Sequence, residues 1–256
     1  MSLNVAHGRK LARQQLFVRP HRFHANLHEV ARVIRREAPD VIALQEADGP
    51  SFWSGDFDHV ERLADLTGYG HCFRGEHHRV RLGSRSVSTG TALLSRHPLD
   101  APASHIFPRA PITGRKGFVV ATLRLPGGQA VDVVSVHLDF LRKRLRRRQI
   151  LAMERELTRR ENPLIILGDM NCWWRRRNDA LGMLVERLGV RPCRPEAEDL
   201  ATFPSRRPRL RLDWVLLSPG LEFGHYAILA DRVSDHLAVL AEVRLRPAAR
   251  ASHRAG

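Results

Sequence analysis

The sequence predicts a single α/β domain. Its 256 residues suffice for one large domain but hardly for two. Short apolar runs bounded by polar residues, which are typical of buried strands, alternate with segments of helical periodicity. Because no repeat, low-complexity linker or shift in composition divides the chain, we expect one domain over residues 1–246. The tail over residues 247–256, rich in Ala, Arg, Ser and Gly, is predicted to be disordered.

Four segments have the periodicity of helices. Over residues 26–37, Leu27, Val30 and Ile34 recur on one face, and Pro39 ends the pattern. This spacing predicts an amphipathic helix. The other three helices are predicted at residues 60–67, 141–161 and 179–188.

The predicted strands are short apolar runs that end in polar groups. Residues 40–46 run from Asp40 through an apolar stretch to Glu46, so a buried strand delivers a carboxylate at its end. An unusually short first strand precedes Asn4, and the polar segment 70–90 is predicted to be a loop near the functional site. Further strands are predicted at residues 90–95, 117–125, 130–137, 163–171, 212–217 and 238–245.

The charge balance favours polyanionic partners. Lys and Arg outnumber Asp and Glu by 42 to 27, which gives a net charge of +15. Nucleic acid, anionic phospholipid or a phosphate-bearing substrate would suit this excess, although high Arg use from GC-rich coding would produce the same balance. The densest basic run, residues 142–148, would suit a phosphate backbone or an anionic membrane, or would simply face solvent.

The cysteine content and the hydropathy of the sequence indicate where the protein is expected to be located. The three cysteines, Cys72, Cys172 and Cys193, form no C-x-x-C pair, so neither a disulfide framework nor a structural zinc site is indicated. No stretch of about 18 apolar residues could span a bilayer. With no secretory signal pattern we expect a cytoplasmic location, the alternative being a start further upstream and a lost leader. Separately, we expect a monomer.

The strongest chemical pattern follows the apolar run that starts at Pro163. This run leads into Gly168-Asp169-Met170-Asn171, where alternate residues Asp169 and Asn171 are expected to face the same side of a strand. A carboxylate and a carboxamide in one pocket can position a water molecule and hold a hard cation. The alternative is a turn-forming Asx pair without chemistry.

Histidine and aspartate recur at other strand ends. Asp235 and His236 precede a strand, His137 ends one, and Asp213 lies within an apolar strand. A buried carboxylate needs a partner. An imidazole N–H is the natural one, since it fixes the tautomer and leaves the other ring nitrogen free for proton transfer.

Taken together, these motifs resemble the endonuclease/exonuclease/phosphatase superfamily, in particular its small bacterial members. The resemblance rests on six motifs in the order of the family, namely Asn4, Gln45-Glu46, His137-Leu138, Gly168-Asp169-x-Asn171, Leu212-Asp213 and Ser234-Asp235-His236. It implies a deoxyribonuclease I-like, four-layer α-β-β-α sandwich with two sheets face to face and helices outside.

The resemblance also implies a role for each residue. Mg²⁺, for which Mn²⁺ can substitute, would be held by Glu46 with Asn4 and Asp235. Five residues would carry the chemistry of an in-line attack by water on phosphorus. They are His137, Asp169, Asn171, Asp213 and His236.

Several positions depart from the family pattern. Many relatives have an acidic or polar residue two positions after the first Asn, whereas this chain has Ala6 followed by His7, so the metal is expected to depend more on Glu46 and Asp235. Arg115 and Lys116 stand near the place where relatives grip phosphate. Aromatic side chains at the rim, or alternatively in the core, are predicted at Trp173 and Trp174.

The predicted function is therefore a magnesium-dependent hydrolase of phosphate esters. A phosphodiesterase of the nuclease type is favoured. The alternatives are a phospholipid phosphodiesterase of the sphingomyelinase kind, a phosphatase, and a catalytically silent member that binds nucleic acid or protein.

Overall fold

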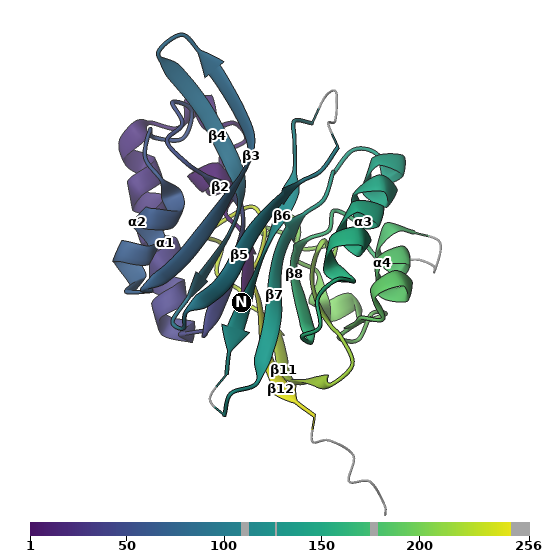
Figure 1. The fold of residues 1–256 in the computed structure, drawn as a ribbon. Helices are drawn as coiled ribbons and strands as arrows, with labels where there is room; N and C mark the ends of the chain where they lie inside the picture. The colour runs from purple at the N-terminus through teal and green to yellow at the C-terminus, as the bar shows by residue number, and fades with distance from the viewer. Residues whose placement is uncertain (109–112, 126, 175–178, 247–256) are drawn as a thin grey trace, which may run out of the picture.

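The computed structural model describes residues 1–108, 113–125, 127–174 and 179–246. The predicted disorder of residues 247–256 therefore lies outside the described residues. Within the described part, the strands form two six-stranded sheets. Figure 1 shows the two sheets side by side, with one pair of helices on either flank.

The first sheet surrounds the very short first strand. Strand β1 (Ser2–Asn4) pairs with β2 in parallel and with β12 antiparallel, so it lies in the middle of the sheet although it is only three residues long. The strand order is β11-β12-β1-β2-β4-β3. The remaining bounds are β2 (Val41–Asp48), β3 (His71–Leu82), β4 (Arg85–Ser95), β11 (Leu221–Ile228) and β12 (Val239–Leu245).

The second sheet has the order β5-β6-β7-β8-β10-β9. Strands β7 and β8 pair in parallel, and the long connection between them contains a helix, as parallel neighbours require. The bounds are β5 (Leu99–Ile106), β6 (Gly117–Arg124), β7 (Ala130–His137), β8 (Leu164–Asp169), β9 (Arg191–Pro192) and β10 (Asp213–Leu217).

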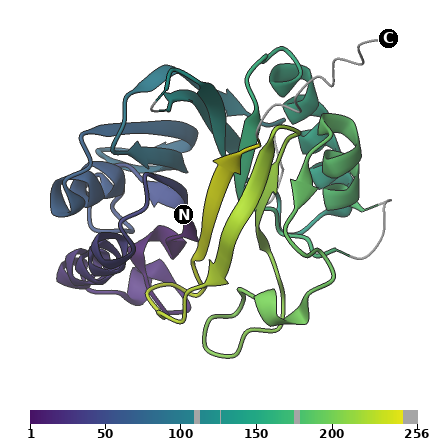
Figure 2. The same cartoon turned by 90° about the horizontal axis from the view of Figure 1, so that it is seen from below.

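Helices cover the outer face of each sheet. The first sheet carries α1 (Pro20–Glu37) and α2 (His59–Thr67), and the second carries α3 (Lys143–Leu157) and α4 (Ala180–Leu188). Figure 2, seen from below, shows both sheets between the two outer helical layers. Short 3₁₀ helices are η1 (Ala6–Gly8), η2 (Gln15–Phe17) and η3 (Glu198–Leu200). The four-layer sandwich implied by the resemblance is confirmed.

Three apolar clusters hold these layers together. One lies between the two sheets and includes Ala43, Val133 and Leu167, and the other two lie beneath the helices. Because both faces of the central strands are buried, they read in the sequence as continuous apolar runs. This is why β2, β6, β7, β8 and β10 were predictable within a few residues.

The predicted loop over residues 70–90 is wrong. Those residues form most of a long hairpin in which β3 pairs with β4 along its whole length. Its distal half, from Arg79 to Arg85, is exposed and rich in arginine, so the apolar signal of a strand is missing there. Strands β5 and β11, which were not predicted, are also edge strands of their sheets, and nearly all of their residues are half-buried or exposed.

Helix α1 begins six residues earlier than predicted. Pro20 occupies its first turn, where the missing N–H of proline costs no hydrogen bond. The added turn is mostly exposed, and Phe23 is its buried residue. Helix α3 is shorter than predicted at both ends. At its start, Asp139 accepts hydrogen bonds from the backbone N–H groups of Leu141 and Arg142 just before the helix begins.

Candidate functional site

Three polar residues meet where three neighbouring inner strands of the second sheet end or begin. The strand register places His137 of β7 opposite Asp169 of β8, and Asp169 opposite Asp213 of β10. Gly168 makes this arrangement possible. Its φ is +150°, and a Cβ there would lie only 1.9 Å from the carbonyl oxygen of Val136 on β7.

The predicted partnership of Asp213 with an imidazole is confirmed. Nδ1 of His236 lies 2.8 Å from Oδ2 of Asp213, and both residues are buried. Thr202 donates its hydroxyl to the same oxygen at 2.6 Å. Nε2 of His236 is thereby turned toward Asp169, whose Oδ2 lies 3.8 Å away.

The first sheet contributes Asn4 and Glu46. The carboxamide nitrogen of Asn4 donates to Oδ2 of Asp169 at 3.0 Å, which joins the two sheets across the site. Glu46 lies at a β-bulge in the pairing of β2 with β4, with a φ of +51°. A bulge re-aims a side chain, so the carboxylate turns away from the regular alternation of β2. Its Oε1 lies 4.0 Å from Nε2 of His137.

His7 and Asp48 form a second pair that sequence reasoning missed. Nδ1 of His7 lies 2.8 Å from Oδ1 of Asp48, and Nε2 of His7 lies 3.3 Å from Oε2 of Glu46. Asp48 is fully buried and also accepts hydrogen bonds from Trp53 and Ser54. The available signals were the position of His7 three residues after Asn4 and that of Asp48 two residues after Glu46.

Seven side chains consequently form a row in which carboxylates and imidazoles alternate. Nε2 of His137, near the middle of the row, lies 3.5 Å from Oδ2 of Asp169. A His–Asp pair closes the row at each end. In order, the row contains Asp48, His7, Glu46, His137, Asp169, His236 and Asp213.

The charges at the Glu46 end of the row differ from those of free side chains. Burial raises the pKa of Glu46, but His7, His137 and Lys116 outweigh it and hold that pKa well below its ordinary value. Burial, and then Lys116, lower the pKa of His137. Burial likewise lowers the pKa of Lys116, against the pull of nearby carboxylates. Glu46 is therefore ionised at neutral pH.

At the other end, the proton lies on His236. Burial lowers the pKa of His236, but Asp213 and Asp169 outweigh it and raise that pKa well above its ordinary value. Burial raises the pKa of Asp169, which His236 opposes and Asp213 reinforces. An imidazolium thus faces a carboxylate that binds protons more readily than a carboxylate in water.

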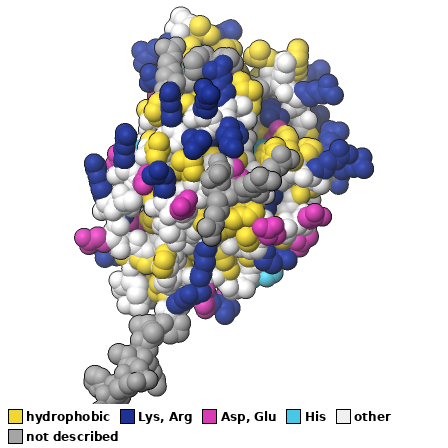
Figure 3. Space-filling view, turned by 90° about the vertical axis from the view of Figure 1, so that its right-hand side faces the viewer, with side chains coloured by type: hydrophobic (Ala, Val, Ile, Leu, Met, Phe, Trp, Pro, Cys, Tyr) yellow, Lys and Arg dark blue, Asp and Glu magenta, His cyan; other side chains and the backbone are white. Residues whose placement is uncertain are grey.

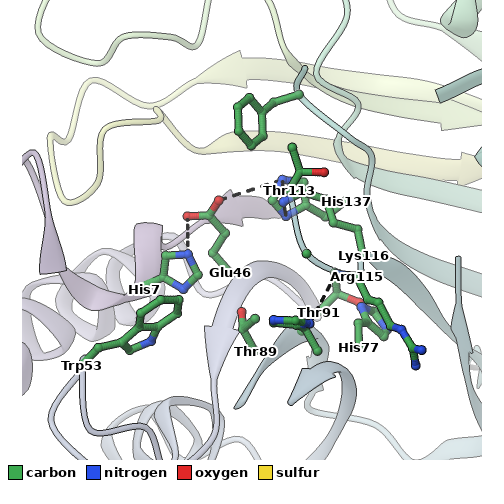
Figure 4. A pocket seen from close by; sticks show the side chains of 14 residues that line it. His7, Glu46, Trp53, His77, Thr89, Thr91, Thr113, Arg115, Lys116 and His137 are labelled. Atoms are coloured by element: carbon green, nitrogen blue, oxygen red, sulfur yellow. Dashed lines mark hydrogen bonds and ion pairs between the residues drawn. The ribbon is translucent and has the colours of Figure 1, made fainter. Parts of the chain in front are cut away.

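A pocket of about 310 Å³ opens over the Glu46 end of the row. Figure 4 shows Glu46 between His7 and His137, with Lys116 and His77 on the opposite side of the pocket. Nζ of Lys116 lies 2.9 Å from Nε2 of His137. Arg115 is exposed, and it also lines the pocket. Both residues predicted to contact phosphate therefore border the pocket.

Asn171 is placed differently from the prediction. Strand β8 ends at Asp169, and Asn171 has a φ of +48°, so the alternation that should bring both side chains to one side does not continue. The backbone N–H of Asn171 donates to Oδ1 of Asp169, and its side-chain nitrogen donates to the carbonyl of Leu138. Asn171 thus orients Asp169 and fastens the end of β8 to the chain that follows β7.

Three predicted residues line other pockets instead. Oδ2 of Asp235 lies 2.6 Å from Nη2 of Arg9, and the pair lines a different pocket. Trp173 is partly exposed, and Trp174 packs against the core beneath α4 and donates to Glu196. Both tryptophans line a third pocket, of about 660 Å³.

The buried part of the row has the donor atoms of a metal site. Asp169, Asp213 and His236 offer ligand atoms that all lie within 4.8 Å of one another. The bond between Nδ1 of His236 and Oδ2 of Asp213 engages one possible donor atom of each residue, whereas Oδ1 of Asp213 is buried without a hydrogen-bond partner. Glu46 is ionised and borders the open pocket, so the Glu46 end is the more accessible place for a cation.

His77 makes the stability of the protein depend on pH. Burial, and then Lys116, lower its pKa to about 3, and its Nε2 is buried without a partner. The unfolded chain takes up a proton on this imidazole near pH 6.5, whereas the folded protein does so only near pH 3. The free energy of unfolding is therefore highest above about pH 6.5 and falls as the pH decreases from there toward 3.

We expect the free energy of unfolding to fall by about 1.4 kcal/mol for each pH unit below 6.5 on account of His77 alone. Urea unfolding of the wild type and of His77→Leu between pH 4.5 and 7.5 measures this. The slope should be shallower by that amount in His77→Leu and unchanged in a His225→Gln control, which alters an exposed residue. Equal slopes in wild type and His77→Leu would contradict the assignment.

The chain is similar to known proteins both in sequence and in structure. A family model described as the Endonuclease/Exonuclease/phosphatase family matches residues 1–236. An endonuclease/exonuclease/phosphatase from Beutenbergia cavernae has a similar structure, with 25% identity and a TM-score of 0.71, over 86% of this chain and 66% of that one. This chain thus spans about two thirds of the length of that protein.

Two more distant structures share the fold. One is an endonuclease/exonuclease/phosphatase from Bacteroides vulgatus, with 14% identity and a TM-score of 0.72 over 96% of this chain and 97% of that one. The other is a mannosyl-6-phosphatase from Bacteroides thetaiotaomicron, with 13% identity and a TM-score of 0.66 over 86% and 91%. At these identities the likeness concerns the fold. In the described part of the chain, no helix is long and apolar enough to cross a membrane.

Proposed function

Because the chain belongs to the endonuclease/exonuclease/phosphatase family, whose members are generally hydrolases of phosphate esters, we propose that it is a metal-dependent phosphodiesterase of the nuclease type. The observation that carries the proposal is the row of alternating carboxylates and imidazoles beside a pocket bordered by Lys116. Such a row combines metal ligands, a proton acceptor and cationic donors within one site, which is what hydrolysis of a phosphate ester requires.

The residues at the Glu46 end suit a divalent metal ion, and we propose that Mg²⁺ supports hydrolysis there. Glu46 is ionised and would be the main ligand, and the amide of Asn4 lies on the adjacent strand β1. Mg²⁺ keeps several waters, so one or two protein oxygens and a substrate phosphate complete its shell. Bound there, it would polarise a phosphoryl oxygen and neutralise developing charge. Asp235 is left out of this ligand set because its carboxylate is paired with Arg9.

Asp169 is the proposed acceptor of the proton of the attacking water. Its raised pKa brings its basicity closer to neutral pH, where general bases are most effective. The Nδ2 of Asn4 and the N–H of Asn171 each donate to one of its oxygens and hold the carboxylate in place. Asn171 therefore acts through Asp169, and not by binding the water itself.

His236 is the proposed donor to a phosphate oxygen. Asp213 and Asp169 keep it protonated, which favours a phosphate contact over the role of general base. The hydrogen bond to Asp213 leaves Nε2 free to donate toward the site. Lys116 and His137 would face the same phosphate from the other side, with Lys116 as a point charge.

Positive charge outside the pocket favours a polyanionic substrate. The first turns of α3 expose Arg144, Arg147 and Arg148, close in sequence to His137. Figure 3 shows Lys and Arg side chains gathered over the upper part of the face that α3 and α4 form. Contacts of this kind track a phosphate backbone without reading its sequence.

The purified protein is expected to hydrolyse bis-p-nitrophenyl phosphate with Mg²⁺ or Mn²⁺ and to lose this activity in EDTA. Asp169→Ala is the control for contaminating hydrolases. A panel of single- and double-stranded DNA, RNA, phospholipid vesicles and soluble phosphomonoesters then separates the nuclease from a lipid phosphodiesterase or a phosphatase. Inactivity on every substrate with every divalent ion tried would favour a protein that only binds.

A further inference from the structure

The His7–Asp48 pair has a geometry that the phosphate chemistry above does not use. Asp48 accepts at Oδ1 from His7 and at Oδ2 from both Trp53 and Ser54, so its carboxylate is fixed by three donors in a fully buried position. With Nδ1 of His7 committed to Asp48, its Nε2 can point only one way. It points at the carboxylate of Glu46, as Figure 4 shows.

Two electron-pair donors then face each other. In the neutral ring with its proton on Nδ1, Nε2 carries a lone pair, and Oε2 of Glu46 carries others only 3.3 Å away. Such a contact is repulsive unless a positive centre lies on it. That centre is either a proton on Nε2 or a metal ion bound by both atoms.

The separation of the two atoms suits a metal ion. Adjacent ligand atoms of an octahedral ion with bonds of about 2.1 Å lie about 3.0 Å apart. The observed 3.3 Å is within a few tenths of an ångström of this value. Metal-binding histidines usually donate their other N–H to a carboxylate, which is the arrangement that Asp48 provides.

The backbone supports the same placement. Ala6 and His7 have φ values of +49° and +52°, a conformation that costs about 1–2 kcal/mol for each L-residue. This turn begins two residues after Asn4 and brings His7 to Glu46, which lies at the bulge of β2. Ala6 has no polar group of its own, so His7 is the donor that this turn brings to Glu46.

We propose that His7 is a metal ligand, oriented by Asp48, which together with Glu46 gives the cation site one imidazole nitrogen and makes it bind Mn²⁺ in preference to Mg²⁺. Mg²⁺ prefers oxygen ligands, so an imidazole nitrogen disfavours it, whereas the first-row divalent ions bind mixed nitrogen and oxygen sites, with Mn²⁺ the weakest of them. Mg²⁺ can still support hydrolysis when it is in excess. The inference rests on the proposed function, since it concerns the same metal site.

The test is the direct detection of the metal–nitrogen bond. The full-length protein is stripped of metal and loaded with one equivalent of Mn²⁺ alone, and electron spin echo envelope modulation is recorded. Coupling of Mn²⁺ to a ¹⁴N nucleus is expected in the wild type and should be lost or reduced in His7→Gln. The exposed-site variant His225→Gln is the matched control and should keep the wild-type coupling.

Affinities measured on the same samples give a second readout. We expect His7→Gln to raise the Kd for Mn²⁺ by about 10-fold or more, and Asp48→Asn to raise it by about 10-fold, as for other partners of metal-binding histidines. The Kd for Mg²⁺ should change much less. Circular dichroism confirms that each variant is folded. If His7→Gln does not fold, Asp48→Asn still tests the proposal.

Unchanged nitrogen coupling and unchanged Mn²⁺ affinity in His7→Gln would overturn the proposal, leaving a proton on Nε2 as the positive centre. Hydrolysis of bis-p-nitrophenyl phosphate is assayed in parallel. Metal-dependent hydrolysis without nitrogen coupling refutes the ligand and leaves the proposed function standing. Nitrogen coupling that depends on His7, without hydrolysis of any substrate, supports the ligand and refutes the function.

Discussion

Replacing His236 by alanine is expected to lower kcat for bis-p-nitrophenyl phosphate by about 10²–10⁴-fold, the usual scale for a group that transfers or shares a proton in the transition state. The variant loses the imidazolium that Asp213 and Asp169 hold beside the site. It also leaves Asp213 buried without its 2.8 Å partner. Steady-state kinetics with saturating metal measures the change.

Two controls separate chemistry from folding in this variant. His225→Ala removes an exposed imidazole and should retain wild-type turnover. Thermal unfolding reports the cost of removing the imidazole partner of the buried Asp213 carboxylate, to which Thr202 still donates; a lost partner of a buried polar group costs about 1–3 kcal/mol. Turnover within a few-fold of wild type in folded His236→Ala would remove His236 from the mechanism.

The second large effect is expected for Glu46→Gln. Glutamine has nearly the same shape but no charge, so the site loses its ionised ligand while His7, His137 and Lys116 remain around it. Transition-state stabilisation by a metal is worth several kcal/mol, which corresponds to a loss of about 10³-fold in metal-dependent kcat/KM.

Titration with Mg²⁺ distinguishes a lost ligand from a lost fold. If Glu46 binds the metal, activity in Glu46→Gln should recover in part at high Mg²⁺, whereas the exposed-site control Glu242→Gln should show the wild-type dependence on metal. The same metal requirement in Glu46→Gln and wild type would place the metal elsewhere, for example on Asp169, Asp213 and His236.

Most of the candidate site could be predicted from residues at the ends of buried strands. His137, Asp169 and Asp213 each lie on a strand that is buried on both faces and mostly apolar, and such strands are the clearest signal in a sequence. Their motifs follow the order of the family, so the resemblance identified them together. The pairing of Asp213 with an imidazole followed from the cost of burying a lone carboxylate.

The sequence by itself determined the central strands, the fold family and the residues of the row from Glu46 to Asp213. It did not determine the edge strands β3, β5, β9 and β11, because an edge strand is covered on fewer sides and keeps polar residues that hide its pattern. Only the tertiary structure decided which groups the side chains of Asp235 and Asn171 contact. Asp235 pairs with Arg9, and Asn171 turns to the backbone of Leu138.

The same reason applies to the Glu46 end of the site. The bulge at Glu46 and the left-handed turn at His7 are departures from regular geometry, which no periodicity in the sequence reveals. Asp48 can accept a hydrogen bond from His7 only because β1 and β2 are neighbours in the sheet. Contacts between segments about 40 residues apart depend on the packing of the whole chain, so the second His–Asp pair became visible only in the folded protein.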